Sequence, residues 1–200
     1  MISDPASEIR EHLISSRDTL DAALAERSFL ETAADIAKCL EAALRGGHKI
    51  LLAGNGGSAG DAQHIAGEFL CRLNYDRAPI AAIALTTDSS VITAIGNDYG
   101  YDRVFERQVL GLGRPGDVFL AISTSGRSAN VLAGASAARK MGLTVIGFTG
   151  QHGGELVQMC DLSLRAPSDS TPLIQQLHIT IAHAVCGLVE AALFPRNASG

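Results

Sequence analysis

The sequence has few charged residues and no cluster of basic ones. Charged side chains make up 18% of the 200 residues, hydrophobic side chains make up 46%, and the formal net charge is -5. Disordered chains have the opposite balance, so we expect a folded chain with a large buried core. An acidic chain without a Lys/Arg cluster has no electrostatic basis for binding nucleic acid, and we expect no such partner.

Cysteine pairs and targeting segments are also missing. The four cysteines, Cys39, Cys71, Cys160 and Cys186, form no CxxC pair. They lie in apolar stretches, where free cysteine usually behaves as a small hydrophobic residue, and a chain of this size does not need a disulfide framework. Residues 1–20 lack a basic segment followed by an apolar core, so we expect no signal peptide and a cytoplasmic protein.

One uncharged segment requires a comparison with membrane helices. Residues 171–189 contain no Asp, Glu, Lys or Arg. They do contain Gln175, Gln176, His178 and His183, whose polar side chains are unfavourable in lipid. We therefore predict a buried helix at a subunit interface, and no membrane partner.

Hydrophobic periodicity separates a helical start from an alternating remainder. Residues 5–45 have apolar residues at helical spacing, and their length predicts two helices that meet near Arg27. Residues 171–193 are apolar around most of a helix, which predicts a buried helix and suggests oligomerisation. Between them lie five short apolar segments that we predict to be strands: 49–53, 80–85, 118–123, 144–149 and 162–166.

Apolar strands that alternate with helical segments indicate an α/β fold. The continuous apolar character of the strands predicts a parallel sheet that is covered on both faces, with right-handed crossovers. A length of 200 residues favours one domain, and two small domains are the alternative. Ligands of such sheets bind at the carboxyl ends of the strands, so the residues that follow each strand are the first candidates for a site.

A glycine-rich turn follows the first predicted strand. The sequence "GNGGS" (54–58) can turn tightly and can expose backbone N–H groups to an anion at the start of a helix. The pattern is not GxGxxG, and the lysine of a Walker motif is missing, so neither a dinucleotide nor ATP is favoured. The alternative is a plain tight turn between a strand and a helix.

A second turn, "STSGRS" (123–128), follows the third predicted strand. Its four hydroxyl groups stand beside a glycine and before a helix. Hydroxyl and N–H groups in that position can hold a phosphate monoester without a lysine. The alternative is helix capping by Ser125 or Ser128, but a cap needs one hydroxyl group and four are present.

The sequence "IGNDYG" (95–100) is a third candidate. Asn97 and Asp98 carry short polar side chains that could form hydrogen bonds with sugar hydroxyl groups. The same pair could form an Asx turn, because both residue types bond to their own backbone. The local pattern favours neither interpretation.

His64 and Glu68 are a fourth candidate. Their i, i+4 spacing puts both on one face of a helix, where two ligands can bind one divalent metal. The alternative is a polar surface pair. Two ligands are too few, and the last helix offers Gln175, His178 and His183 as further candidates. Spacing does not decide between the two histidines, and Gln175 ranks low because a neutral oxygen is a poor zinc ligand.

Five motifs together are more specific than any single glycine loop. They are "AGNGGSAGDAQHIAGEF", "LTTDSSVITAIGNDYGY", "AISTSGRSANV", "GFTGQHGGEL" and "STPLIQQLHITIAHAVCGLVE". Their combination resembles the SIS-domain (sugar isomerase) family, and within it the isomerases of phosphorylated heptoses. The resemblance covers most of the chain, from the N-terminal helices to the final helix.

This resemblance implies an SIS-type three-layer sandwich, in which helices flank a five-stranded parallel sheet. It implies one SIS domain over residues 1–200, with a helical segment at 1–46 that is used in oligomerisation and a sheet core with the C-terminal helix at 47–200. It also implies a homotetramer and one Zn²⁺ per subunit. The implied zinc ligands are His64, Glu68, Gln175 and His183.

The implied activity is the conversion of D-sedoheptulose 7-phosphate to D-glycero-D-manno-heptose 7-phosphate through an enediol. This would be the first step of nucleotide-activated heptose biosynthesis, for lipopolysaccharide core, capsule or S-layer. Glu68 is the expected base and His183 the expected acid, and Asp61 is a candidate for a supporting contact or a helper in proton transfer. The implied substrate contacts are Asn55, Gly56, Gly57, Ser58, Glu68, Asn97, Asp98, Ser123, Thr124, Ser125, Ser128 and Gln175.

Two other hypotheses stay open. Some SIS proteins of this size are tetrameric binding proteins, such as the DnaA initiator-associating protein, and a relative without catalysis should lack the acid at position 68. This chain keeps Glu68, which favours an enzyme. Other SIS proteins isomerise or epimerise different sugar phosphates, and the fold alone does not fix the chemistry. The metal candidates favour the heptose phosphate.

Overall fold

A five-stranded parallel sheet forms the centre of the computed structural model, which describes residues 4–196. The strand order is β2-β1-β3-β4-β5. All five predicted strands are present, although β2 is shorter than the predicted 80–85 because it lies at the sheet edge and pairs only with β1 over three residues. The strands are β1 (Ile50–Gly54), β2 (Ala82–Ala84), β3 (Val118–Ile122), β4 (Thr144–Gly150) and β5 (Leu162–Ala166).

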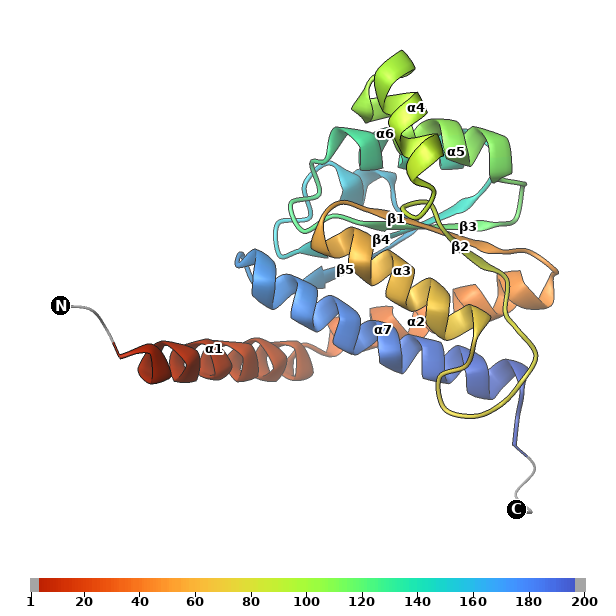
Figure 1. Cartoon of the computed structure of the whole chain (residues 1–200). Coiled ribbons are helices and arrows are strands. Elements are labelled where there is room, and N and C mark those ends of the chain that lie inside the picture. The colour runs from red at the N-terminus through yellow and green to blue at the C-terminus, as the bar shows by residue number, and fades with distance from the viewer. Residues whose placement is uncertain (1–3, 197–200) are drawn as a thin grey trace.

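Helices cover both faces of the sheet, which confirms the predicted α/β fold (Figure 1). Alternate residues of each strand point to opposite sides, so Leu52 and Leu120 pack toward α2, α3 and α7, whereas Leu51 and Phe119 pack toward α5 and α6. The helices of the first face are α2 (Arg27–Arg45), α3 (Gly57–Leu70) and α7 (Thr171–Leu193); those of the second are α4 (Ser89–Tyr99), α5 (Val104–Leu112) and α6 (Ala129–Lys140). Two short 3-10 helices complete the fold, η1 (Tyr101–Arg103) and η2 (Leu156–Met159).

The N-terminal helix α1 (Pro5–Ala25) projects away from the sheet (Figure 1). The predicted junction of two helices is confirmed at Glu26, whose extended backbone (φ -91°, ψ 98°) separates α1 from α2. The Asp4 side chain caps the first turn of α1. A hydrogen bond from Ser16 Oγ to Gln176 Oε1, 2.8 Å long, ties α1 to α7.

By length and composition alone, α7 could cross a membrane. In the fold, however, its residues Ile174, Leu177, Val185 and Val189 pack into the core beside α2 and α3. The prediction of a buried helix is therefore confirmed for this face of α7. Its predicted place at a subunit interface stays a prediction.

All four cysteines are free, as predicted. Cys186 is buried, and burial raises the pKa of its thiol to about 12. Cys71 is exposed, so the expectation that every cysteine acts as a small core residue was wrong there. The reason is its position directly after the last residue of α3, where the chain leaves the core.

The sheet brings two of the predicted loops together. β1 pairs with β2 on one side and with β3 on the other, so the carboxyl ends of β1 and β3 meet where the chain changes direction across the sheet. Gly54 stands opposite Ile122 in the register. The turn after β1 and the turn after β3 therefore begin side by side, at the place where α/β sheets bind ligands.

Candidate active site

The turn after β1 packs tightly against α7. Gly56 has a positive φ of 55°, which favours glycine, and a Cβ atom on Gly57 would lie 2.5 Å from Nε2 of Gln175. Ser58 is buried, and its Oγ accepts a hydrogen bond of 3.4 Å from the same Gln175 amide. Because α3 begins at Gly57, its positive N-terminal end stands at this turn, where the N–H groups of Ser58, Ala59 and Gly60 donate to the carbonyls of Asn55 and Gly56.

Residues 123–128, which we call the serine loop, follow β3. Oγ of Ser123 and Oγ of Ser128 lie 3.1 Å apart. Gly126 has a φ of 63°, and a Cβ atom there would lie only 1.9 Å from the carbonyl oxygen of Gly153. The loop is therefore held by backbone packing that tolerates no side chain at position 126.

Helix capping does not use the Ser128 hydroxyl. Ser128 occupies the position before α6, but its side chain makes no capping hydrogen bond. Oγ of Ser125 accepts a bond of 3.2 Å from the backbone N–H of Arg127, and the carbonyl of Thr124 accepts one of 2.9 Å from the N–H of Gly150. The hydroxyl groups of Ser123 and Ser128 thus lie together at the start of α6, where the helix dipole favours an anion.

Two asparagines join the turn after β1 to the start of α6. The Asn55 and Asn130 amides exchange two hydrogen bonds, 2.8 and 2.9 Å long. The backbone N–H of Val131 donates to Oδ1 of Asn130, which fixes the orientation of that buried amide. The exposed Tyr101 hydroxyl also donates to Oδ1 of Asn55, at 3.2 Å. These bonds hold the two loops at a fixed separation.

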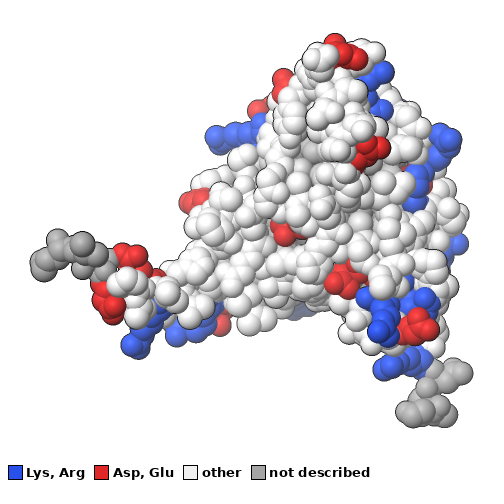
Figure 2. Space-filling model, viewed as in Figure 1, with Lys and Arg blue, Asp and Glu red and all other residues white. Residues whose placement is uncertain are grey.

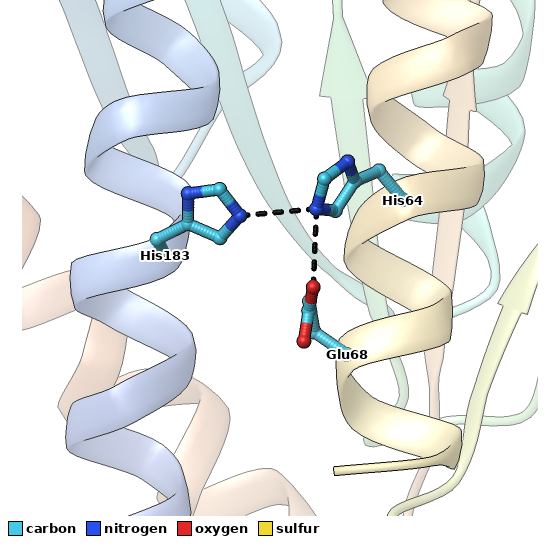
Figure 3. Close-up of side chains that lie close together, drawn as sticks. All are labelled: His64, Glu68 and His183. Atoms are coloured by element: carbon cyan, nitrogen blue, oxygen red, sulfur yellow. Dashed lines mark hydrogen bonds and ion pairs between the residues drawn. The ribbon is translucent and has the colours of Figure 1, made fainter. Parts of the chain in front are cut away.

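Three side chains from α3 and α7 lie close together (Figure 3). Nε2 of His64 lies 3.1 Å from Oε1 of Glu68 and 3.0 Å from Nε2 of His183. The side chain of His64 is 47% exposed and that of Glu68 is 20% exposed, so solvent or a ligand can reach them. We call His64, Glu68 and His183 the His–Glu cluster.

The His–Glu cluster fits a divalent metal. One ligand atom from each of its three residues lies within 4.8 Å of the others. Ligands about 2.0–2.2 Å from a tetrahedral ion stand roughly 3.3–3.6 Å from one another, slightly more than the 3.1 and 3.0 Å that separate Nε2 of His64 from the other two ligand atoms. Two imidazole nitrogens and one carboxylate oxygen are also a donor set that zinc accepts and that leaves a coordination position open.

The structure separates the two histidines that spacing could not. His183 belongs to the His–Glu cluster, whereas His178 is buried on the sheet side of α7 with Nε2 3.0 Å from the carbonyl oxygen of Thr149. Burial lowers the pKa of His178 to about 4, although the bond to Thr149 acts in the opposite direction. His178 is thus a neutral core residue.

Asp61 lies one turn before His64 on α3. Its Oδ2 atom is buried and has no hydrogen-bond partner among residues 4–196. Burial raises the pKa of this carboxyl, and the neighbouring His64 lowers it. A buried acceptor without a donor beside the cluster is consistent with a supporting role toward a ligand.

Gln175 lies about two helical turns before His183 and contacts Gly57 and Ser58. Asn97 and Asp98 lie in the last turn of α4. Their predicted place after a strand was wrong, because Asp88 caps α4 through the N–H of Val91 and the helix continues through both residues. Of the two open alternatives, the Asx turn does not fit this helical position, and the contact with sugar hydroxyl groups stays a prediction. They are exposed, and Nδ2 of Asn97 donates to Oδ1 of Asp98 at 2.8 Å.

Sequence reasoning missed Asn130, Tyr101 and a buried ion pair, Arg77–Glu190. Asn130 stands two residues after the serine loop, and a polar residue at the second position of an apolar helix could have drawn attention to it. Tyr101 and the ion pair carry no local signal, because their partners lie 46 and 113 positions away.

The fold and site define an SIS domain. The family model described as "SIS domain" matches residues 14–150, which is more than half of the chain, and the chain belongs to that family.

Within this family, the chain is similar over most of its length to phosphoheptose isomerases. The chain is 56% identical over 187 residues to the phosphoheptose isomerase of Bradyrhizobium sp. (strain ORS 278), covering 94% of each chain. It is 50% identical over 189 residues to that of Burkholderia pseudomallei (strain K96243), covering 94% of this chain and 96% of the relative. The solved structure of the Neisseria gonorrhoeae phosphoheptose isomerase is similar, with a TM-score of 0.88 and 41% identity, over 94% of this chain and all of that one.

Proposed function

We propose that this chain is a zinc-dependent isomerase that converts D-sedoheptulose 7-phosphate to D-glycero-D-manno-heptose 7-phosphate. The observation that carries the proposal is the His–Glu cluster, two residues of which lie on the helix that follows the turn after β1, in a chain 50–56% identical to two phosphoheptose isomerases. The product would enter the synthesis of nucleotide-activated heptose. The presence of Glu68 in the cluster supports an enzyme over an SIS protein that only binds a partner.

The phosphate would bind the serine loop, whose hydroxyl groups stand at the N-terminus of α6. The turn after β1 would contact the sugar through its backbone and Ser58. Binding of the phosphate far from the reacting carbons would orient those carbons at the other end of the sugar. The full proposed set of substrate contacts is Asn55, Gly56, Gly57, Ser58, Glu68, Asn97, Asp98, Ser123, Thr124, Ser125, Ser128 and Gln175.

The reaction moves one proton between neighbouring carbons. Glu68 would remove the proton from C1 of the ketose while His183 donates a proton to the carbonyl oxygen on C2, which gives a cis-enediol. Return of the proton to C2, with loss of the hydroxyl proton on C1, gives the aldose. The 3.1 Å contact between His64 and Glu68 would hold the carboxylate in place before substrate binds.

Residues His64, Glu68, Gln175 and His183 would hold one Zn²⁺ per subunit. When bound, the ion supplies polarisation of the carbonyl oxygen or orientation of the sugar oxygens. A carboxylate that binds a cation is a weaker base, so Glu68 would need looser ligation when the substrate is present. Asp61, with its unpartnered buried oxygen, would support the cluster or assist the proton transfer.

A substrate panel tests the activity. Purified protein, with its zinc content measured, is assayed with sedoheptulose 7-phosphate and with pentose, hexose and hexosamine phosphates. We expect turnover of the heptose phosphate, loss of turnover after chelation, and recovery with added zinc. Faster turnover of another sugar phosphate, or no turnover of any, would overturn the proposal.

The substitution Glu68→Gln tests the proposed base. Because general base catalysis contributes roughly 10²–10⁴-fold, we expect kcat to fall by at least 10²-fold. Glu31→Gln removes an exposed carboxylate from α2 and serves as the control, with activity expected near that of the wild type. A Glu68→Gln variant with wild-type kcat would show that Glu68 is not the base.

We also propose a cytoplasmic homotetramer of single-domain subunits, with residues 1–46 in the contacts. Exposed Ile9, Leu13 and Leu24 on α1 and Leu188 on α7 support this proposal, because such side chains are usually covered in an oligomer. The side of the molecule shown in Figure 2 carries few Lys, Arg, Asp or Glu side chains over its central area. Sedimentation of the wild type should give the mass of four chains, and a monomer would contradict the proposal.

A further inference from the structure

A buried ion pair lies outside the His–Glu cluster and links the same two helices. Nε of Arg77, in the segment after α3, lies 3.0 Å from Oε1 of Glu190, near the end of α7. The side chains are 2% and 1% exposed. Burial of two opposite charges is unfavourable unless further hydrogen bonds satisfy both groups. The hydrogen bonds around each group therefore show what the pair contributes to the fold.

The Arg77 guanidinium holds the end of α3. Its Nη2 donates to the carbonyl of Glu68, and its Nη1 donates to the carbonyl of Phe69, both at 2.7 Å. These are among the last carbonyls of a helix that ends at Leu70, where no further N–H is available within the helix and where a positive charge is favoured. Arg77 therefore bonds to the backbone of a residue of the His–Glu cluster itself.

The Glu190 carboxylate holds the segment that carries Arg77. Its two oxygens accept hydrogen bonds from the backbone N–H groups of Leu73 and Asn74, at 3.0 and 2.8 Å. Burial acts to raise the pKa of Glu190, but these bonds and the bond from Arg77 outweigh it and lower the pKa. The carboxylate is therefore charged, and every donor around it comes from the segment between α3 and β2.

The positions of these residues couple the pair to the cluster. His183 and Glu190 are seven residues apart on α7, which puts them about 20° apart around the helix and roughly 10 Å apart along it. Arg77, which follows α3, donates a hydrogen bond to the carbonyl of Glu68 in that helix. We infer that Arg77 and Glu190 are positioning residues that fix the separation and register of α3 and α7, and with them the ligand atoms of the His–Glu cluster. The inference rests on the proposed function, because it assumes that the cluster holds zinc.

A second ion pair with a buried carboxylate offers a control. Lys49 and Asp117 form an ion pair at the amino ends of β1 and β3, whereas the candidate site begins at the carboxyl ends of these strands. Asp117 is 2% exposed, and its carboxylate accepts backbone N–H bonds from Lys49 and Arg114, as Glu190 does from Leu73 and Asn74. Loss of either carboxylate charge should lower stability, but only Glu190 is joined to a helix of the cluster.

The experiment compares Glu190→Gln, Arg77→Lys and Asp117→Asn in the full chain. The zinc affinity of the metal-free proteins is measured by competition with a coloured chelator, together with the visible spectrum of bound Co²⁺, kcat, and the unfolding midpoint. For Glu190→Gln we expect zinc affinity to fall by about 10-fold or more, the range seen when contacts behind a ligand are lost, with a changed Co²⁺ spectrum and a lower kcat. Arg77→Lys keeps the charge but loses the planar fork, and should show a smaller change in the same direction.

Asp117→Asn should lower the unfolding midpoint and leave zinc affinity and the Co²⁺ spectrum within twofold of the wild type. The inference is overturned if the Glu190 and Arg77 variants keep wild-type zinc affinity and spectrum, or if Asp117→Asn loses affinity to the same extent. If Glu190→Gln does not fold, Arg77→Lys decides by the same readings. A wild type that binds no zinc or turns over no sugar phosphate would instead contradict the proposed function.

Discussion

The serine loop holds its hydroxyl groups by backbone geometry, whereas the His–Glu cluster is assembled from side chains up to 119 positions apart. The loop comes from six consecutive residues, and its shape depends on Gly126 fitting against Gly153. The cluster depends on how two helices lie relative to each other. A local motif can therefore specify the first half of the site, but only the packed fold can specify the second.

The largest expected effect is a loss of stability from a substitution that disturbs the backbone of the serine loop. Gly126→Ala puts a Cβ atom 1.9 Å from a carbonyl oxygen at a φ of 63°, so we expect the free energy of unfolding to fall by about 3 kcal/mol or more. Gly111→Ala, in α5, meets nothing within 4 Å and should be neutral or stabilise by about 0.5–1 kcal/mol. Urea unfolding measures both, and equal midpoints for the two variants would show that the loop can relax.

A smaller expected effect, on kcat/KM, tests whether the serine loop and the His–Glu cluster contribute independently. Ser128→Ala removes one proposed phosphate contact, so kcat/KM should fall about 10–100-fold, the range for a hydrogen bond to a charged group. Zinc content should not change, because Ser128 is not part of the cluster. The control Ser136→Ala, in α6 beyond the loop, should stay within twofold of the wild type. Loss of zinc from Ser128→Ala would mean that the halves are not independent.

The smallest effect concerns the histidine that the cluster leaves out. Because the pKa of His178 is lowered to about 4, the unfolded chain binds more protons than the folded one between pH 4 and 6.5. Stability should therefore fall as the pH drops through this window, by about 1.4 kcal/mol for this residue between pH 7.5 and 5.5. His178→Gln should flatten that slope in urea unfolding. An unchanged slope would assign the pH dependence to other groups.

Sequence reasoning succeeded where the signal is local. Short apolar runs located all five strands, and the long segment that is apolar around most of a helix located α7 within its observed bounds. The edge strand β2 was predicted too long, because an apolar run does not reveal how many residues find a partner. Asn97 and Asp98 were misplaced because their turn-forming character was overridden by a helix that Asp88 had already capped.

The rest depends on tertiary packing. His178 and His183 are separated by about 140° around α7, so one must face the sheet and the other α3, but the rotation of α7 about its axis is set by its neighbours. The Arg77–Glu190 pair is equally invisible in the sequence, because an arginine in a polar loop normally indicates a solvated side chain.

Helix α3 begins at the turn after β1 and carries two of the three residues of the His–Glu cluster, His64 and Glu68. Ser58 lies in its first turn, and at 1.5 Å per residue His64 and Glu68 follow about 9 and 15 Å further along the axis. Under the proposed function, α3 would set the distance between the phosphate end and the carbonyl end of a bound sugar. One residue inserted between Ser58 and His64 would turn His64 by about 100° relative to Ser58. In the proposed function, this six-position spacing would therefore affect both the length of sugar accepted and the metal site.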